Sequence, residues 1–321
     1  MKKLLRAALF AAGLSAGTLG YAQNWPSQPI KIIVNFAPGG AADQLARVVA
    51  PLLNEALKQP VIVENKTGAG GNLGGLQVAK ATADGYTLLM SSGGMVSINP
   101  HIYPKMPFDP AKDLVPVASI ARVPFYLVVR AESSIKDYKG LIAELKARPG
   151  RFSFGSPGNG SSPHLAAEML KSETGTFAIH IPYRGAAPAL SDLLGGQIDF
   201  LFDPGIAIQH VKSGRLRMLA VASPKRAPQM PDVPTLDELG MKGFDADAVF
   251  GLYAPAGTPQ AIVDQLNSEV NRALNAPATK EKIFALGNVP QPMTPNEFRL
   301  KGVADSQRFG AVIRARGIQG D

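Results

Sequence analysis

Three glycine-rich turns carry most of the small polar residues that could hold a ligand. The segments APGGAAD (37–43), NKTGAGGNLGG (65–75) and SSGGM (91–95) each follow a short apolar run. A helix that begins at such a turn presents unpaired N–H groups and a positive dipole end, which attract an anion. The alternative is a tight strand-to-helix turn that binds nothing. The first and third turns supply the candidates Ala37, Pro38, Gly39, Gly40, Asp43, Ser91 and Gly93.

A second group of candidates lies further along the chain, in SPGNGSSPH (156–164), in PYRG (182–185) and at Asp203. Arg184 offers a planar fork of donors that suits a carboxylate, although a salt bridge would also explain it. Tyr183 is either a cleft wall or core. Ser162 followed by Pro163 predicts a helix that starts at Pro163, with Ser162 as its cap. Asp203, like Asp43, either contacts ligand or caps a helix, and Asp is among the best capping residues. The candidates here are Ser156, Gly158, Ser161, Ser162, His164, Tyr183, Arg184, Gly185 and Asp203.

Other chemistries find little support in the sequence. The four histidines lack metal-ligand spacing, and there is no HExxH motif or paired CxxC motif, so we predict no metal site. The serines of 156–162 are not in a G-x-S-x-G elbow, and no nucleophile–base pairing is recognised, which counts against a hydrolase. The dinucleotide frame that begins at Gly68 requires a glycine where Leu73 stands, so we predict no cofactor.

The first 22 residues have the pattern of a signal peptide. Lys2, Lys3 and Arg6 precede an apolar stretch, and Gly20-Tyr21-Ala22 resembles a cleavage site, which would leave Gln23 as the first mature residue. The chain has no cysteine, hence no disulfide and no lipid-anchored cysteine. We therefore expect an exported, periplasmic protein that depends on core burial for its stability.

The net charge of the chain is +8, and three of these charges belong to the leader, which leaves about +5 on the mature chain. Its basic residues are scattered and are not interleaved with aromatic residues, so nucleic acid is a poor fit. A mild positive excess suits a small anionic ligand.

The elements that must position the candidates form two α/β units. Three strand–turn–helix units in succession (30–58, 61–80 and 86–95) predict a parallel sheet, whose carboxyl edge brings the three turns together. Pro51 predicts a kink in the first helix. A second α/β pattern occupies 137–222, and an apolar strand (248–253) and three proline-initiated helices (259–275, 278–286 and 295–316) follow. This order implies two chain crossings, at 118–128 and 244–250, and hence a hinge.

Several ordered motifs resemble those of one receptor family. PGGAAD, VENKTGAGGNLG, DGYTLL, SPHL, IPYRG and LLGGQIDF together resemble the Bug-type periplasmic solute receptors of tripartite tricarboxylate transporters. The resemblance covers essentially all of the mature chain, and Pro51 has no place in the family pattern. It implies small carboxylate ligands, held mainly by backbone groups and hydroxyls at the ends of the first strands. The residues that it carries over are Pro38, Gly39, Gly40, Asp43, Ser156, Gly158, Ser161, Ser162, Tyr183, Arg184 and Gly185.

The fold that the resemblance implies is α/β: a two-domain periplasmic binding protein of type II (Venus flytrap). Each domain would be a mostly parallel sheet flanked by helices, joined by two hinge crossings. We expect domain I to comprise 23–122 and 245–321, and domain II 123–244.

The function that the resemblance implies is a monomeric, non-enzymatic receptor. It would capture a mono- or dicarboxylate, including aromatic and amino acids, and deliver it to membrane transporter subunits. Two alternatives stay open: a ligand-sensing receptor for a two-component sensor, and a secreted α/β enzyme that acts on a carboxylate.

Overall fold

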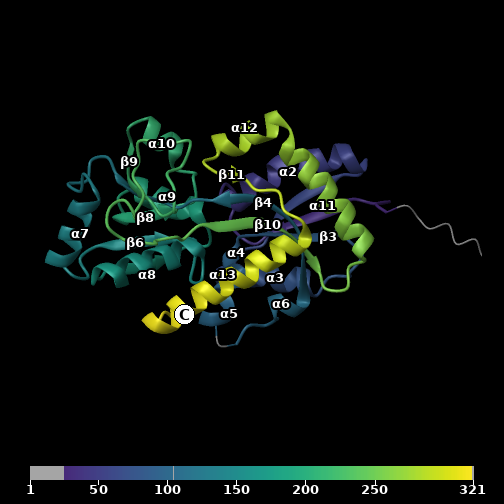
Figure 1. Cartoon of the computed structure of the whole chain (residues 1–321), viewed down its shortest axis with the longest axis horizontal. Helices are drawn as coiled ribbons and strands as arrows, with labels where there is room; N and C mark the ends of the chain where they lie inside the picture. The colour runs from purple at the N-terminus through teal and green to yellow at the C-terminus, as the bar shows by residue number, and fades with distance from the viewer. Residues whose placement is uncertain (1–24, 104, 320–321) are drawn as a thin grey trace, which may run out of the picture.

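The computed structural model, shown in Figure 1, describes residues 25–103 and 105–319. The predicted signal peptide (1–22) and its cleavage site lie outside the described residues. The chain forms two α/β units, each built around one sheet, with β4 and β10 running between them (Figure 1).

The first sheet, sheet A, has six strands in the order β11-β4-β10-β3-β1-β2. Its parallel part is β2-β1-β3, which comes from the predicted strand–turn–helix units. The remaining pairs are antiparallel, because β4 leaves the unit for the second sheet and β10 returns from it. The strands are β1 (Ile30–Val34), β2 (Val61–Asn65), β3 (Thr87–Ser91), β4 (Leu114–Val123), β10 (Ala248–Pro255) and β11 (Val289–Pro290).

The second sheet, sheet B, has five strands in the order β7-β6-β8-β5-β9. Its pairs β6·β7 and β6·β8 are parallel, whereas β5 runs antiparallel to both β8 and β9. Both sheets are therefore mixed and not, as we had expected, mostly parallel, because the parallel pairing is confined to the crossover units. The strands are β5 (Tyr126–Arg130), β6 (Ser153–Ser156), β7 (Ile179–Pro182), β8 (Phe200–Asp203) and β9 (Leu216–Val221).

The helices surround these two sheets (Figure 1). Those of the first unit are α2 (Ala41–Leu57), η1 (Ala69–Gly71), α3 (Asn72–Ala79), α4 (Gly93–Ser97), α5 (Asn99–Ile102) and α6 (Pro110–Asp113). Those around sheet B are α7 (Tyr138–Ala147), α8 (Ser162–Thr174), α9 (Ala186–Leu194) and α10 (Ile208–Lys212). The tail forms α11 (Gln260–Asn275), α12 (Pro277–Ala285) and α13 (Pro295–Arg316), all three close to the predicted ranges.

The local chemistry differs from the sequence predictions in three places. Asp43 does not cap α2: Gly40 holds the cap position, and Asp43 lies in the first turn of the helix. Ser161, and not Ser162, is the N-cap of α8, because the helix begins one residue earlier than predicted. The helix α2 is continuous through Pro51, which it accommodates on an exposed face.

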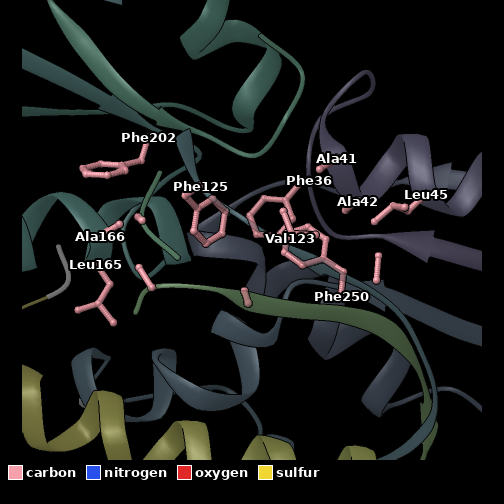
Figure 2. Close-up of a cluster of buried hydrophobic side chains, with 14 of the residues drawn as sticks. Phe36, Ala41, Ala42, Leu45, Val123, Phe125, Leu165, Ala166, Phe202 and Phe250 are labelled. Atoms are coloured by element: carbon pink, nitrogen blue, oxygen red, sulfur yellow. The ribbon is translucent and has the colours of Figure 1, made fainter. Parts of the chain in front are cut away.

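The two crossings join the sheets at a hinge. The break between β4 and β5 falls at Pro124-Phe125, and β10 begins at Ala248, so both lie within the predicted crossing segments. The exact domain boundaries at 122/123 and 244/245 stay a prediction. Apolar side chains fill the junction, and Phe125 and Phe250 from the two crossings lie there with Phe36 (Figure 2).

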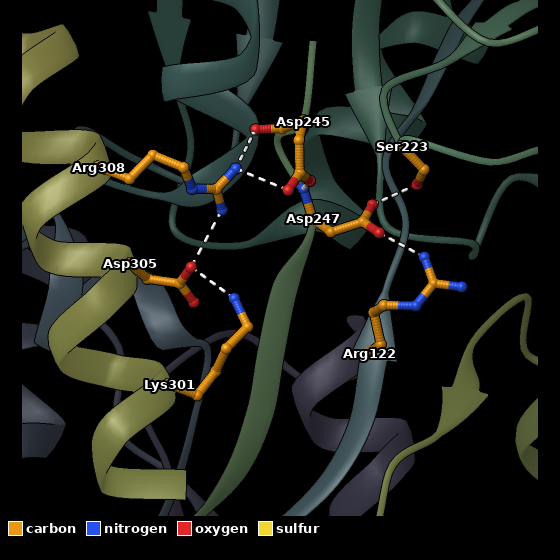
Figure 3. Close-up of polar contacts among 7 residues, drawn as sticks. All are labelled: Arg122, Ser223, Asp245, Asp247, Lys301, Asp305 and Arg308. Atoms are coloured by element: carbon orange, nitrogen blue, oxygen red, sulfur yellow. Dashed lines mark hydrogen bonds and ion pairs between the residues drawn. The ribbon is translucent and has the colours of Figure 1, made fainter. Parts of the chain in front are cut away.

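A polar network crosses the same hinge (Figure 3). Arg122 at the end of β4 pairs with Asp247 just before β10, and the Ser223 hydroxyl donates to the same carboxylate. Burial raises the pKa of Asp247 to about 6, although its ion pair with Arg122 opposes this shift. Arg308 on α13 pairs with Asp245 at 2.8 Å, which ties the last helix to the return crossing.

Candidate functional site

A narrow cavity, which we call the deep chamber, lies between the two α/β units. Its volume is about 20 Å³. Its walls come from both sheets' loops and from both crossings. They are Phe36, Gly40, Ala41, Ala42, Ser92, Phe125, Pro157, Ser161, Pro163, Ala186, Pro204 and Phe250.

Two helices begin at the deep chamber without a side chain at their cap position. Gly40 precedes α2 and Gly185 precedes α9, and glycine has no side chain to accept a hydrogen bond from the first turn. The first N–H groups of a helix have no acceptor inside the helix. The starts of α2 and α9, one from each unit, therefore offer donors and two positive dipole ends to an anion in the chamber.

Asp43 fixes the loop before α2. Its carboxylate accepts hydrogen bonds from Gly39 N–H (2.9 Å), from the Asn65 amide (2.9 Å) and from Arg47 (3.0 Å). Burial alone would raise the pKa of Asp43, but these bonds outweigh it and hold the pKa below its ordinary value. Asp43 thus shapes the loop, and its pairing with Arg47 limits the repulsion that its charge would exert on an anion.

The two glycines of this loop have different roles. Gly39 has a φ of +78°, in the left-handed region that favours glycine. Gly40 has a φ of −76° and an extended ψ of 169°, which any residue can adopt. Gly40 is important because it leaves open the gap between the starts of the two helices, where a Cβ would stand 3.8 Å from Ala186 N.

Two serine hydroxyls are buried near the chamber with no hydrogen-bond partner among the described residues. Ser92 Oγ lies in the chamber wall, and Ser162 Oγ faces Gly94 on the opposite unit. The other predicted serines are engaged: Ser91 accepts from Asn35, Ser156 bonds to His180, and Ser161 donates to Gly158 O. A buried hydroxyl without a partner costs free energy, and a bound carboxylate would satisfy it.

An outer chamber, with a volume of about 280 Å³, adjoins the deep one. It shares Phe36 and Pro157 with the deep chamber, and its other walls are the loop 67–71, Leu73, Tyr183 and Arg184. Arg184 is exposed, it lines this chamber, and its side chain makes no hydrogen bond or ion pair with the described residues. Tyr183 donates its hydroxyl to Asp192 at 2.6 Å, which holds the ring in the wall.

The cleft is closed by direct contacts between the two units. Ala37 N–H donates to Arg184 O at 3.1 Å, and the Tyr103 hydroxyl donates to Asn159 O at 2.9 Å. A Cβ on Gly70 would stand 2.2 Å from that same Asn159 oxygen, so the glycine allows the approach. The first glycine turn thus lies against the loop before α9, and the second lies against the loop before α8.

The structure reveals a serine–histidine pair that the sequence analysis did not recognise. Ser156 Oγ lies 2.6 Å from His180 Nε2, and the ring of His164 stacks on His180 with centroids 4.2 Å apart. Burial lowers the pKa of His180 to about 4 and that of His164 to about 3, so both rings are neutral at pH 7. Ser156 is 1% exposed and also bonds to Gly158, which makes the pair part of the wall behind the cleft, not an accessible nucleophile.

Asp203 ends β8 directly before Pro204 in the deep chamber wall. One of its oxygens accepts the N–H groups of Gly205 (2.7 Å) and Ala207 (2.8 Å), so it organises the turn before α10. The other oxygen is buried with no hydrogen-bond partner in the described part of the chain. Full burial raises the pKa of this carboxyl to about 7.

The sequence candidates therefore divide into three groups. Gly40 and Ser161 line the deep chamber, and Tyr183 and Arg184 line the outer one. The others line neither chamber: Ala37, Pro38, Gly39, Asp43, Ser91, Gly93, Ser156, Gly158, Ser162, His164, Gly185 and Asp203.

Sequence reasoning missed several residues of the deep chamber wall. These are Phe36, Ala41, Ala42, Ser92, Phe125, Pro157, Pro163, Ala186, Pro204 and Phe250. Ser92 carried a usable signal, because it occupies the cap position after a buried strand. No group of His, Asp or Glu among the described residues could hold a metal ion, and no described helix is long and apolar enough to cross a membrane.

Comparison with known sequences decides the family. The profile described as "Tripartite tricarboxylate transporter family receptor" matches residues 45–318. The chain belongs to this family. BugT of Bordetella pertussis is 40% identical over 301 residues, which cover 93% of this chain and 92% of BugT. A UPF0065 protein of a Pseudomonas strain is 41% identical, over 82% of this chain and 79% of its own length.

Solved structures of family members share the fold. A protein of R. palustris, solved with adipate, is 33% identical, with a TM-score of 0.90 over 93% of this chain and 100% of that one. MatC from Rhodopseudomonas palustris, solved with malate bound, is 31% identical, with a TM-score of 0.86 over 90% and 100%. The periplasmic binding protein BugD is 33% identical, with a TM-score of 0.88 over 92% and 100%. The two-domain periplasmic binding fold and the Bug-type resemblance are thereby confirmed.

Proposed function

We propose that this chain is a periplasmic receptor that captures one small organic carboxylate and delivers it to the membrane subunits of a tripartite tricarboxylate transporter. The observation that carries the proposal is the deep chamber, where α2 and α9, one from each unit, both begin after a glycine at the wall of one cavity. The adipate and malate in related structures support a carboxylate as the ligand.

The ligand binds without chemical change. Its acid group accepts hydrogen bonds from the N–H groups of Ala41, Ala42 and Ala186, and the Ser92 hydroxyl donates a further one. Because donors come from both units, the anion is bound more tightly in the closed form, and this difference in affinity is what shifts the hinge equilibrium. Exclusion of water strengthens each of these contacts. Arg184 lines the outer chamber and contacts the ligand as it enters.

The chain acts as a monomer after export and removal of residues 1–22. A thermal-shift screen of mono-, di- and tricarboxylates tests the binding step. Saturating ligand, at about 100 times its dissociation constant, stabilises the folded state by about 2.7 kcal/mol. Stabilisation by nucleotides with none by carboxylates would contradict the proposal.

Delivery is tested by uptake. Proteoliposomes that contain the transporter's membrane subunits should take up the labelled acid only when the loaded receptor is added outside. Uptake that is equally fast without the receptor would contradict delivery and would leave a ligand-sensing role.

A further inference from the structure

The two units also make direct contact beside the two chambers. We call this contact the side junction: Gly70, Asn99 and Tyr103 of the first unit meet Asn159 and Gly160 of the second. The Tyr103 hydroxyl donates to Asn159 O at 2.9 Å, and this bond joins one unit to the other. Neither Tyr103 nor Asn159 lines the deep chamber or the outer chamber.

Glycines allow the two backbones to approach each other at the side junction. A Cβ on Gly70 would stand 2.2 Å from Asn159 O, and a Cβ on Gly160 would stand 2.1 Å from Asn99 Oδ1. Real Cβ atoms essentially never come so close to another heavy atom, so a side chain at either position would force the two units apart or displace these groups. The side junction is therefore a close fit that forms only when the units come together.

Two polar atoms of the side junction are buried without a hydrogen-bond partner within the residues that the structure describes. Asn99 Nδ2 donates to Gly70 O (3.1 Å) and to Asn72 Oδ1 (2.7 Å), but Asn99 Oδ1 and Asn159 Nδ2 are unpaired. Burying such atoms costs free energy. The bond from Tyr103 offsets part of this cost, so its loss should shift the equilibrium between the open and closed forms.

We propose that Tyr103 is a positioning residue, which raises the affinity for every ligand by stabilising the closed form and makes no contact with the ligand. This inference rests on the proposed function, because a ligand held by both units binds the closed form more tightly. A lost contact that exists only in the closed form lowers the closed population, and the apparent affinity falls with that population. The factor depends on the protein alone, so it is the same for all ligands.

The first variant is Tyr103→Phe, which keeps the ring and removes the hydroxyl. The net contribution of one hydrogen bond changes an equilibrium constant about two- to tenfold. Calorimetry of the full mature chain with malate, adipate and benzoate should therefore show one common loss of affinity, in this range, for each acid that binds. Tyr86→Phe is the matched control: the Tyr86 hydroxyl accepts from Ser27 N–H at 2.9 Å, inside the first unit, and the affinities should not change.

The second variant, Gly70→Ala, tests the close approach. Gly70 has a φ of +59°, so alanine there adds backbone strain as well as the clash with Asn159 O. Gly175→Ala is the control for strain, because Gly175 has a φ of +63° and its Cβ would have no described atom within 4 Å. We expect weaker binding in Gly70→Ala alone. Gly70 also lines the outer chamber, so the loss must be common to all three acids to support the side junction.

A distance between the two units distinguishes positioning from a merely structural role. The chain has no cysteine, so Glu55→Cys on α2 and Lys146→Cys on α7 place one exposed spin label on each unit. In a ligand titration, the closed distance should appear at a two- to tenfold higher ligand concentration in Tyr103→Phe than in the parent. At saturation both chains should reach the same distance, whereas a distorted fold would not.

The outcomes separate this inference from the proposed function. An unchanged affinity in Tyr103→Phe, a loss that differs from one acid to another, or a different distance at saturation overturns the inference and keeps the proposed function. If the natural protein binds none of the three acids, and a wider carboxylate panel also fails, the proposed function is wrong and this inference fails with it.

Discussion

A glycine can be needed at position 40 either because a side chain would fill space that the ligand uses or because the backbone adopts a conformation that favours glycine. Gly40→Ala distinguishes between these two reasons. Gly40 has a φ of −76°, which alanine adopts without strain. The new Cβ would stand 3.5 Å from Ala37 O, 3.8 Å from Ala186 N and 3.9 Å from Ala186 Cβ, all ordinary contacts. Replacing glycine by alanine at a compatible site stabilises a protein by about 0.4–1 kcal/mol, because the unfolded chain loses freedom. The unliganded variant should therefore be slightly more stable than the natural protein.

Ligand binding should change in the opposite direction. The added methyl group occupies the gap between the starts of α2 and α9, where we propose that the acid group binds. A hydrogen bond to a charged group contributes about 1.5–3 kcal/mol, so the loss of one weakens binding roughly 10- to 150-fold. Thermal denaturation without ligand and calorimetry with the best carboxylate measure the two effects separately.

A matched control is available in α13. Gly302 lies inside that helix, and a Cβ there would stand 3.9 Å from Val96. Gly302→Ala should stabilise the helix by up to about 1 kcal/mol and leave the affinity unchanged. Unaltered affinity in Gly40→Ala would remove the start of α2 from the site. If Gly40→Ala lost both stability and affinity, Gly40 would be needed for the fold and not for the space between the starts of α2 and α9.

Three further changes probe the hinge, the buried histidines and the free hydroxyl. Arg122→Ala leaves the Asp247 carboxylate buried without its partner, and we expect a loss of about 2–3 kcal/mol at pH 8, less than for a fully buried pair because Arg122 is partly exposed. The loss should shrink as pH falls through about 6, where Asp247 takes up a proton, and denaturant titrations at several pH values would show whether it does. His164→Phe removes a group whose pKa is about 3 in the folded state and about 6.5 in the unfolded state. As the pH falls, the unfolded natural protein binds a proton at this histidine that the folded protein does not, so the natural protein loses stability and the variant does not. Between pH 8 and pH 5 the stability of the natural protein should fall by about 2 kcal/mol relative to His164→Phe, and parallel profiles would refute a neutral buried His164. Ser92→Ala should weaken carboxylate binding several-fold by calorimetry without lowering the melting temperature of the unliganded chain, whereas unchanged affinity would exclude the hydroxyl from the site.

The comparison of natural protein and variant matters for the histidine prediction, because buried carboxyls titrate in the opposite sense. Burial raises the pKa of Asp203 to about 7, so its folded form gains protons before its unfolded form does as the pH falls. Acid therefore stabilises the fold through Asp203 and destabilises it through His164 and His180. The contribution of His164 is therefore obtained only from the difference in stability between the natural protein and His164→Phe at each pH.

Much of the fold could be predicted from residue pattern. Apolar runs followed by glycine turns predicted β1 and β3 and the loops after them, and prolines at helix starts placed α11, α12 and α13 closely. The crossings were also predictable, because the returning strand (248–253) lacked a glycine turn of its own. The mixed character of the sheets was not, because the direction of a strand depends on which neighbour it joins.

The loops that meet at the cleft were easier to predict than the contacts of their residues. Glycine turns marked these loops, but the contacts of single residues depend on groups from elsewhere in the chain. Asp43 caps no helix because Asn65 and Arg47 hold its carboxylate under the loop. Phe36 and Phe125 look like ordinary core in the sequence, and only the folded chain brings them together in one wall.

The most direct test of the account is a crystal structure of the chain with the acid that it retains from the cell. We predict that the carboxylate lies in the deep chamber, with its oxygens about 2.7–3.2 Å from the N–H groups of Ala41 or Ala42 on one side and Ala186 on the other. An acid group bound to Arg184 in the outer chamber, with no ligand atom between Gly40 and Ala186, would contradict it.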